Sequence, residues 1–357
     1  MNATTSVYLN LMRFLAAVTV LLCHAGEKQI SGGLFWQIGR YGQDAVSVFF
    51  VLSGFVIAYV THQRETDAGT YALQRAARIY SVAVPALLLT FALDSVSCHY
   101  GSAWMVAQCV NYHSAIPFPL GLAFLGEVWN VHLAPGTNGS YWSLGFEVPY
   151  YLMFGVFRFV PRPWNWIATT LLLLVFGPKI ASMFIVWLTG FACYRLCIRF
   201  SSRHHSRAGL VLWLGSTAAL VVIAGPTGID KIFAPFTMTS ANLLSHLHYL
   251  TLGVLVAANI FGLYLSSNLL APVANRVGRQ IGWLAGATFS IYLFHLPLLD
   301  FVATVSPWPV ESWPTRALVY IGVPAVMFAL AEVTERRKDL WKNGMLAIAT
   351  RFRPTSP

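Results

Sequence analysis

The segment Tyr8-Leu-Asn-Leu-Met-Arg13-Phe-Leu-Ala-Ala-Val-Thr-Val-Leu-Leu-Cys-His24-Ala25 decides the fold class, because it is long and apolar yet carries a cation and an imidazole. Eleven residues at about 100° each return to nearly the same helix face, so Arg13 and His24 share a stripe about 16 Å apart along the axis. A guanidinium that faces lipid would cost about 2.5 to 3.5 kcal/mol. We therefore expect both side chains to face a bundle interior or a watery cavity, and to mark a functional site.

The whole chain is too apolar for an ordinary soluble domain. Of its 357 residues, 57% are hydrophobic and 10% are charged, and the mean hydropathy is +0.61, whereas soluble domains carry about 25% charged residues. Apolar segments recur along the chain at about the length that an α-helix needs to cross 30 Å of hydrocarbon. The composition therefore predicts an all-α, polytopic transmembrane helical bundle.

We expect about ten membrane-spanning helices, with both the N-terminus and the C-terminus in the cytoplasm. The expected spans are 8–25, 45–61, 79–97, 141–158, 164–177, 181–197, 208–224, 244–265, 283–303 and 316–334. Most of the lysines and arginines then fall in cytoplasmic loops, as the positive-inside rule requires. Because the net charge of +10 is spread over short clusters between apolar spans, it does not indicate a nucleic-acid partner.

The chain divides into a transmembrane domain over residues 1–335 and a basic cytoplasmic tail over 336–357. Residues 98–140 are expected to form an outer loop. Within it, the apolar stretch 120–131 is too short to cross a membrane and carries Glu127, which favours a re-entrant or interfacial piece. Cys98 and Cys109 in this loop form either a disulfide, as an oxidising compartment permits, or two free thiols.

The first cytoplasmic loop carries a pair of arginines in the string Gln74-Arg75-Ala76-Ala77-Arg78. Residues three apart are neighbours on a helix surface, so Arg75 and Arg78 are candidates to hold phosphate groups. The alternative is that both are anchors of the positive-inside kind.

Acidic and hydroxyl side chains occur in two further spans. Asp44 is expected at the level of His24, where it orients the imidazole or is simply a loop acid. Farther along the same span, Ser53-Gly54 forms a small-residue notch that permits close helix packing. Ser143 and Glu147 are stacked on one face of a later helix, because they are four residues apart.

Aromatic residues and a second histidine complete the candidate set. Tyr141 and Trp142 suit either a membrane interface or stacking on a sugar ring. His295 stands in mid-span before Pro297, where it is a substrate contact or a core histidine bonded to a neighbour. We expect no metal, since no familiar zinc motif occurs.

Several strings in order resemble the membrane acyltransferase-3 family. They are Arg13 with His24, Phe49-Phe50-x-x-Ser53-Gly54, Arg75-x-x-Arg78, Trp142-Ser-Leu-x-x-Glu147 and Ser290-Ile-Tyr-Leu-Phe-His295. The resemblance covers about residues 6 to 335. The chain departs from the family's common pattern after Glu147, where Val148-Pro149 stands in place of Gln-Phe, and this departure bears on the acceptor more than on the reaction.

The resemblance implies an O-acyltransferase that moves an acyl group, commonly acetyl, from cytoplasmic acyl-CoA to a hydroxyl of a carbohydrate or glycolipid. It implies a multi-pass protein of a bacterial inner membrane, in contact with membrane lipid. His24 matches the essential histidine, which as neutral imidazole would act as general base, with direct transfer or an acyl-histidine both open. Asp44 or Glu147 would fix its tautomer, Arg75 and Arg78 would hold CoA phosphates, and Arg13 would contact the donor. The alternative is a transmembrane transporter of glycans or small molecules.

Overall fold

The computed structural model describes residues 1–100, 117–200, 206–224 and 240–351. All regular elements in these ranges are helical, and no strand occurs among them. The predicted all-α fold class is therefore confirmed. Cys98 is disulfide-bonded, while Cys109, the other cysteine of the expected outer loop, lies outside the described residues.

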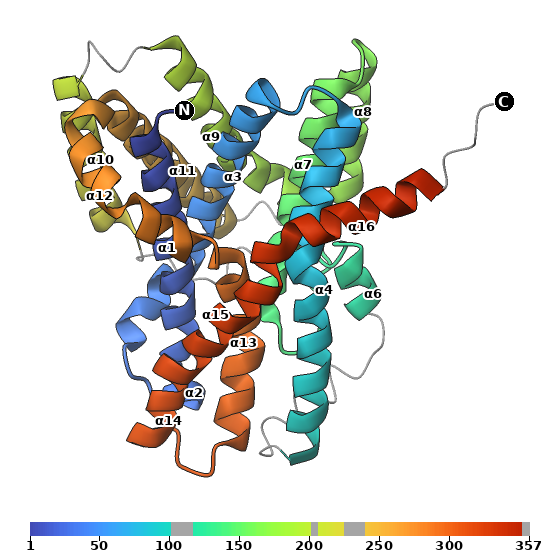
Figure 1. The fold of residues 1–357 in the computed structure, drawn as a ribbon, viewed down its shortest axis with the longest axis vertical. Helices are drawn as coiled ribbons and strands as arrows, with labels where there is room; N and C mark the ends of the chain where they lie inside the picture. The colour runs from blue at the N-terminus through green and yellow to red at the C-terminus, as the bar shows by residue number, and fades with distance from the viewer. Residues whose placement is uncertain (101–116, 201–205, 225–239, 352–357) are drawn as a thin grey trace.

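Most of the described residues lie in long helices (Figure 1). The longer helices are α1 (Ala3–Ala25), α3 (Gly42–Gln63), α4 (Ala68–Tyr100), α7 (Leu144–Phe159), α8 (Trp164–Phe176), α9 (Pro178–Arg199), α10 (Ser206–Ile223), α11 (Ser240–Leu265), α12 (Ser267–Ala285), α13 (Thr288–Val305), α15 (Val323–Val333) and α16 (Lys338–Arg351). The short elements are α2 (Lys28–Ser31), η1 (Trp36–Tyr41), α6 (Pro117–Leu122), η2 (Gly139–Ser143), α14 (Trp313–Ala317), η5 (Leu318–Gly322) and η6 (Glu335–Arg337).

Eight helical stretches in the described ranges are long and apolar enough to cross a membrane, so the chain is a multi-pass membrane protein. The expected count of ten is not confirmed. The difference arises at 141–158 and 164–177, where α7 has 16 residues and α8 has 13. The 3₁₀ turn η2 uses residues 139–143, which shortens α7 at its start.

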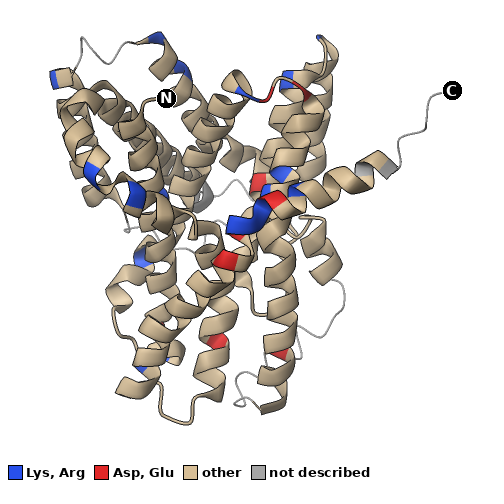
Figure 2. Ribbon diagram, in the orientation of Figure 1, with Lys and Arg blue, Asp and Glu red and all other residues tan. Residues whose placement is uncertain are grey.

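Two ends of the bundle can be told apart by their residues (Figures 1 and 2). At one end, called the basic end here, α3, α7 and α9 all finish, and Arg158 and Arg199 lie in the last turns of the latter two. At the other end, called the His24 end, α1 finishes and is followed by α2. Which end faces the cytoplasm stays a prediction.

Helix α1 lies among α3, α12 and α13, and α3 packs in turn against α9. The crossing of α3 and α9 is close because a glycine stands on each side. A Cβ atom at Gly54 would overlap the backbone of Trp187, and one at Gly190 would overlap the backbone of Val51. The predicted small-residue notch at Gly54 is confirmed, and it brings the backbones together as small residues do in membrane proteins.

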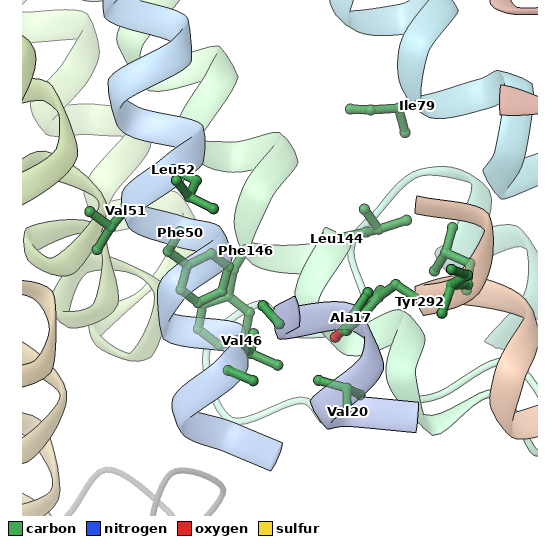
Figure 3. Packing of buried hydrophobic residues seen from close by; sticks show 14 of the residues in the cluster. Ala17, Val20, Val46, Phe50, Val51, Leu52, Ile79, Leu144, Phe146 and Tyr292 are labelled. Carbon is green, nitrogen blue, oxygen red and sulfur yellow. The ribbon is translucent and has the colours of Figure 1, made fainter. Parts of the chain in front are cut away.

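The core between these helices combines aliphatic and aromatic side chains (Figure 3). Phe50 of α3 stacks on Phe146 of α7 with ring centroids 6.1 Å apart, and both are at most 3% exposed. Apolar side chains also cover the outside: Leu88, Val211 and Val222 are 66%, 72% and 78% exposed. Exposed aliphatic groups on long helices are what a lipid-facing surface requires.

The segment 120–131 is held against α9 by a buried ion pair. Glu127 is 1% exposed, and Lys179 at the start of α9 donates to its Oε2 over 2.5 Å. His132 lies 2.7 Å from the other carboxylate oxygen. The carboxylate therefore has two basic partners, which buried charges require.

Two helices lie where the sequence analysis expected no span. Helix α12 carries Arg276 and Arg279 within a stretch expected to be a loop. Helix α16 belongs to the basic tail and packs against α4 (Figure 1).

Candidate active site

A small cavity in the middle of the bundle collects polar side chains from five helices, α1, α3, α4, α7 and α13. Arg13 of α1, Arg78 of α4 and Glu147 of α7 all line it. The other lining residues are Val46, Phe49, Phe50, Ser53, Ser143, Leu144, Thr288, Phe289 and Tyr292. The volume is about 50 Å³, which holds a few water molecules and no substrate. The prediction that Arg13 faces the bundle interior is confirmed.

Glu147 is anchored by a hydrogen-bond network at one side of this central cavity. The Ser53 hydroxyl lies 3.0 Å from Oε1 of Glu147, and the Tyr151 hydroxyl donates to the same oxygen. Trp187 donates its indole N–H to Ser53 over 3.2 Å. Because Ser53 is part of this network, its role goes beyond the packing expected from the sequence.

A second carboxylate lies near the two arginines. Glu335 accepts hydrogen bonds from the backbone N–H groups of Phe289 and Ser290, each over 3.0 Å, at the first turn of α13. An anion at a helix N-terminus is favoured by the helix dipole. No sequence signal pointed to this contact, because Glu335 stands at the boundary of the basic tail and 45 residues from Ser290.

His24 is not among the described residues that line the central cavity. Its ring faces His295, with centroids 5.3 Å apart, and the His295 ring lies 6.1 Å from Tyr292. Tyr292 in turn meets Phe49 edge to face at 5.5 Å. The pair Phe49 and Tyr292, called the aromatic layer here, thus borders the cavity on the side of the two histidines.

The carboxylate that contacts the His24 ring belongs to Glu27. Oε1 of Glu27 lies 2.7 Å from Nδ1 of His24, and the side chains are 37% and 30% exposed. A carboxylate at Nδ1 places the proton there, since an ionised carboxylate only accepts. Nε2 of His24 is then the basic nitrogen. The sequence feature that could have indicated Glu27 is its spacing of three residues from His24. This spacing is informative within a helix, and Glu27 lies past the end of α1.

Asp44 does not occupy this position. Its Oδ1 lies 3.0 Å from Nε2 of His248 in α11, and Asp44 is 8% exposed. The two residues are 204 positions apart in the chain, so spacing could not reveal the pair. The carboxylate expected at His24 is therefore supplied by Glu27.

His295 is buried and fully satisfied as a hydrogen-bonding group. Its Nδ1 lies 2.8 Å from the Tyr292 carbonyl, and its Nε2 lies 3.2 Å from the Ser140 hydroxyl. A carbonyl only accepts, so Nδ1 carries the proton and Ser140 donates to Nε2. With 0% exposure, His295 presents a ring face to His24.

Arg75 and Arg78 line different cavities. Arg78 lines the central cavity, whereas Arg75 lines a cavity of about 500 Å³ between α4 and α7. Nη2 of Arg75 lies 2.6 Å from Glu65 in the connection between α3 and α4. Burial raises the pKa of the Glu65 carboxyl, and the Arg75 guanidinium acts in the opposite direction. Among the described residues, the buried Nε and Nη1 of Arg75 have no hydrogen-bond partner.

The remaining candidates differ in accessibility. Ser143 lines the central cavity. Tyr141 is 3% exposed, stacks on Phe124 and donates to the Gly121 carbonyl over 3.1 Å, so it fixes the segment 121–124. Trp142 is half-buried and meets Phe50 edge to face. Within the described ranges, no group of three His, Cys, Asp or Glu side chains is arranged to hold a metal ion.

The sequence matches a known protein family. A family model described as an acyltransferase domain matches residues 6–332. The chain belongs to the acyltransferase-3 family and is a membrane acyltransferase.

Two relatives are similar along most of their length. The chain is 24% identical over 358 residues to the acyltransferase MdmB of Streptomyces mycarofaciens, covering 88% of this chain and 86% of the relative. It is 27% identical over 329 residues to the exopolysaccharide production protein ExoZ of Rhizobium meliloti (strain 1021), covering 87% and 88%. No solved structure matches the chain.

Proposed function

We propose that this protein transfers an acyl group, in the first instance acetyl, from acyl-CoA to a hydroxyl of a carbohydrate or glycolipid. The observation that carries the proposal is the pairing of His24 with Glu27. It leaves one basic imidazole nitrogen on a partly exposed residue, and the aromatic layer separates this residue from a cavity that holds two arginines. The name of the exopolysaccharide production relative supports a carbohydrate acceptor.

The proposed step uses His24 as general base. Nε2 takes the proton of the acceptor hydroxyl while the hydroxyl oxygen attacks the carbonyl carbon of the thioester. The bond from carbon to sulfur then breaks, and the thiolate of CoA leaves and receives the proton from the imidazolium. Glu27 holds the tautomer and stabilises the imidazolium, as the carboxylate of a catalytic triad does. An acyl-histidine intermediate would divide this step into two.

The donor is proposed to enter from the basic end, which would be cytoplasmic. Arg13 and Arg78 face the central cavity and would contact the diphosphate and the arm of CoA. Arg75 has two buried N–H groups without partners, which suits a further phosphate contact. Because the cavity is only about 50 Å³, the aromatic layer must move before a thioester can reach His24.

The other predicted site residues receive supporting roles. Glu147 and Glu335 would balance the charges of Arg13 and Arg78 when no donor is bound. Ser143 would contact the donor or acceptor within the cavity. His295 would position the His24 ring, and Trp142 would border the acceptor path. The bacterial inner membrane remains the proposed location.

The test is release of free CoA by the purified protein in lipid nanodiscs with labelled acetyl-CoA. We expect CoA release that depends on an added glycan acceptor, with the label recovered on the glycan. The matched control is His24→Ala at equal protein concentration. CoA release at the wild-type rate by His24→Ala would refute the assignment of the base, and transport of glycan without any acylation would favour the transporter alternative.

A further inference from the structure

A second cavity lies at the basic end, between α3, α7 and α9, and has no place in the mechanism above. Its volume is about 330 Å³, within the range of small-molecule sites. Arg158 comes from the last turn of α7, Arg162 from the connection to α8, and Arg195 from α9. His62 of α3 adds an imidazole to the same lining.

The charged side chains that line this cavity are all basic. Among the residues that the structure describes, its lining holds neither Asp nor Glu. None of the three arginines forms an ion pair within the described parts of the chain. All three arginines are exposed, so water screens their mutual repulsion, and an anion bound between them would attract all three. Residues that only set membrane orientation have no need to converge from three elements on one hollow.

The floor of the cavity is aromatic. Phe154, Phe157 and Phe191 line it together with the buried Asn165. Helix α8 begins beside it at Trp164. A ligand that combines phosphate groups with a flat ring would match both the rim and the floor.

This cavity lies on the same helix faces as the central cavity. On α7, Glu147 lines the central cavity, and Phe154 and Arg158 follow it by seven and eleven residues, which returns nearly to the same face. On α3, Phe50 and Thr61 have the same relation. Eleven residues span about 16 Å. The Glu147 network with Ser53, Tyr151 and Trp187 lies between the two cavities.

We propose that the cavity of Arg158, Arg162 and Arg195 binds the phosphate of a nucleotide, namely the adenosine 3′-phosphate end of the acyl-CoA donor. This inference rests on the proposed function, because it assigns one end of the same donor. The phosphate of an anionic lipid headgroup has the same chemistry, so the experiment separates the two sources.

The test measures binding of adenosine 3′,5′-bisphosphate to the full-length protein in phosphatidylcholine nanodiscs. We expect Arg158→Gln, Arg162→Gln and Arg195→Gln each to weaken binding about tenfold or more, as loss of a charged hydrogen bond does. Arg199→Gln, one turn beyond Arg195 and outside the cavity lining, is the matched control and should bind within about twofold of the wild type. Arg→Lys variants should recover part of the loss, and elution as one species on size exclusion checks folding.

A lipid arm covers the other phosphate source. Phosphatidylglycerol retained by the purified wild type but lost from the triple Arg→Gln variant, without nucleotide binding, would place a lipid headgroup in the cavity. Nucleotide binding that the three substitutions leave unchanged, together with equal lipid retention, would overturn the proposal.

The bisphosphate carries neither acyl group nor thiol, so its binding does not depend on transfer. His24→Ala should bind it like the wild type while losing transfer. If His24→Ala stayed active and the arginine variants lost nucleotide binding, the proposed chemistry would fail and the phosphate site would stand. If His24→Ala lost transfer and the arginine variants bound the nucleotide normally, the phosphate site would fail and the proposed chemistry would stand.

Discussion

Oε1 of Glu27 lies 2.7 Å from Nδ1 of His24, across a spacing of three residues at the end of α1. The carboxylate and the His295 ring hold the imidazole from two directions. We therefore expect Glu27→Gln to keep substrate affinity and to lower kcat about 10- to 100-fold, the usual cost of removing an orienting partner. Steady-state kinetics of acyl transfer would measure this. Lys28→Gln, at the exposed residue next to Glu27, is the control, and a Glu27→Gln enzyme with unchanged kcat would remove Glu27 from the mechanism.

Arg78 faces the central cavity, so it is expected to act on donor affinity. Arg78→Gln should raise the KM for acyl-CoA about 10- to 100-fold, because a charged hydrogen bond contributes about 1.5 to 3 kcal/mol. The exposed Arg64, which is outside the central lining, supplies the control Arg64→Gln. An unchanged KM in Arg78→Gln would make Arg78 an orientation anchor.

The aromatic layer is expected to keep the thioester away from water. Tyr292→Ala should open the cavity toward His24 and raise acyl-CoA hydrolysis without acceptor, measured as free CoA. Tyr292→Phe keeps the ring and its contact with Phe49, so it should hydrolyse acyl-CoA at the wild-type rate. Equal background hydrolysis in the Ala and Phe variants would argue against a sealing role.

The ion pair of Glu127 and Lys179 is expected to be a stability element. Lys179→Met leaves a buried carboxylate with only His132 as a basic partner, and breaking a buried pair costs about 3 to 5 kcal/mol. Thermal unfolding in detergent should therefore shift to lower temperature. Combining Lys179→Met with Glu127→Gln should recover part of the loss, because it removes the uncompensated charge. A single variant as stable as the wild type would contradict this account.

The α3–α9 crossing supplies a packing test. Gly54→Val places methyl groups against the backbone of Trp187 and should destabilise the protein by about 1 to 3 kcal/mol, as overpacking does. In the described part of the chain, a Cβ atom at Gly282 would meet no atom within 4 Å beyond its own stretch of helix, so Gly282→Ala is the control. Thermal unfolding would compare the two, and equal midpoints would refute a tight crossing.

Local periodicity predicted the parts of the site that depend on one helix. The inward direction of Arg13 could be predicted because it depends only on the sequence pattern of α1. The close packing at Gly54 could be predicted because glycine lacks a Cβ atom. Periodicity did not predict that Arg75 and Arg78 line different cavities. Three residues correspond to about 300° of helix rotation, so the two side chains point in somewhat different directions, and the packing of neighbouring helices decides which cavity each one reaches.

Contacts between distant segments could not be read from spacing. Asp44 meets His248 and Glu335 meets the start of α13 only because the bundle brings those helices together. Span lengths also depended on local turns: η2 takes the residues at which the fourth span was expected to begin. Periodicity and composition therefore predicted the fold class and the site helices, and tertiary packing determined the partners.

The aromatic layer has a further consequence for a cell whose membrane is energised. In the proposed mechanism an acyl group passes the layer, whereas an open aqueous channel there would let protons run down their electrochemical gradient. Two rings that part only for a thioester would reconcile group transfer with an ion-tight bilayer. On this view Phe49 and Tyr292 preserve the membrane potential of the cell during every turnover.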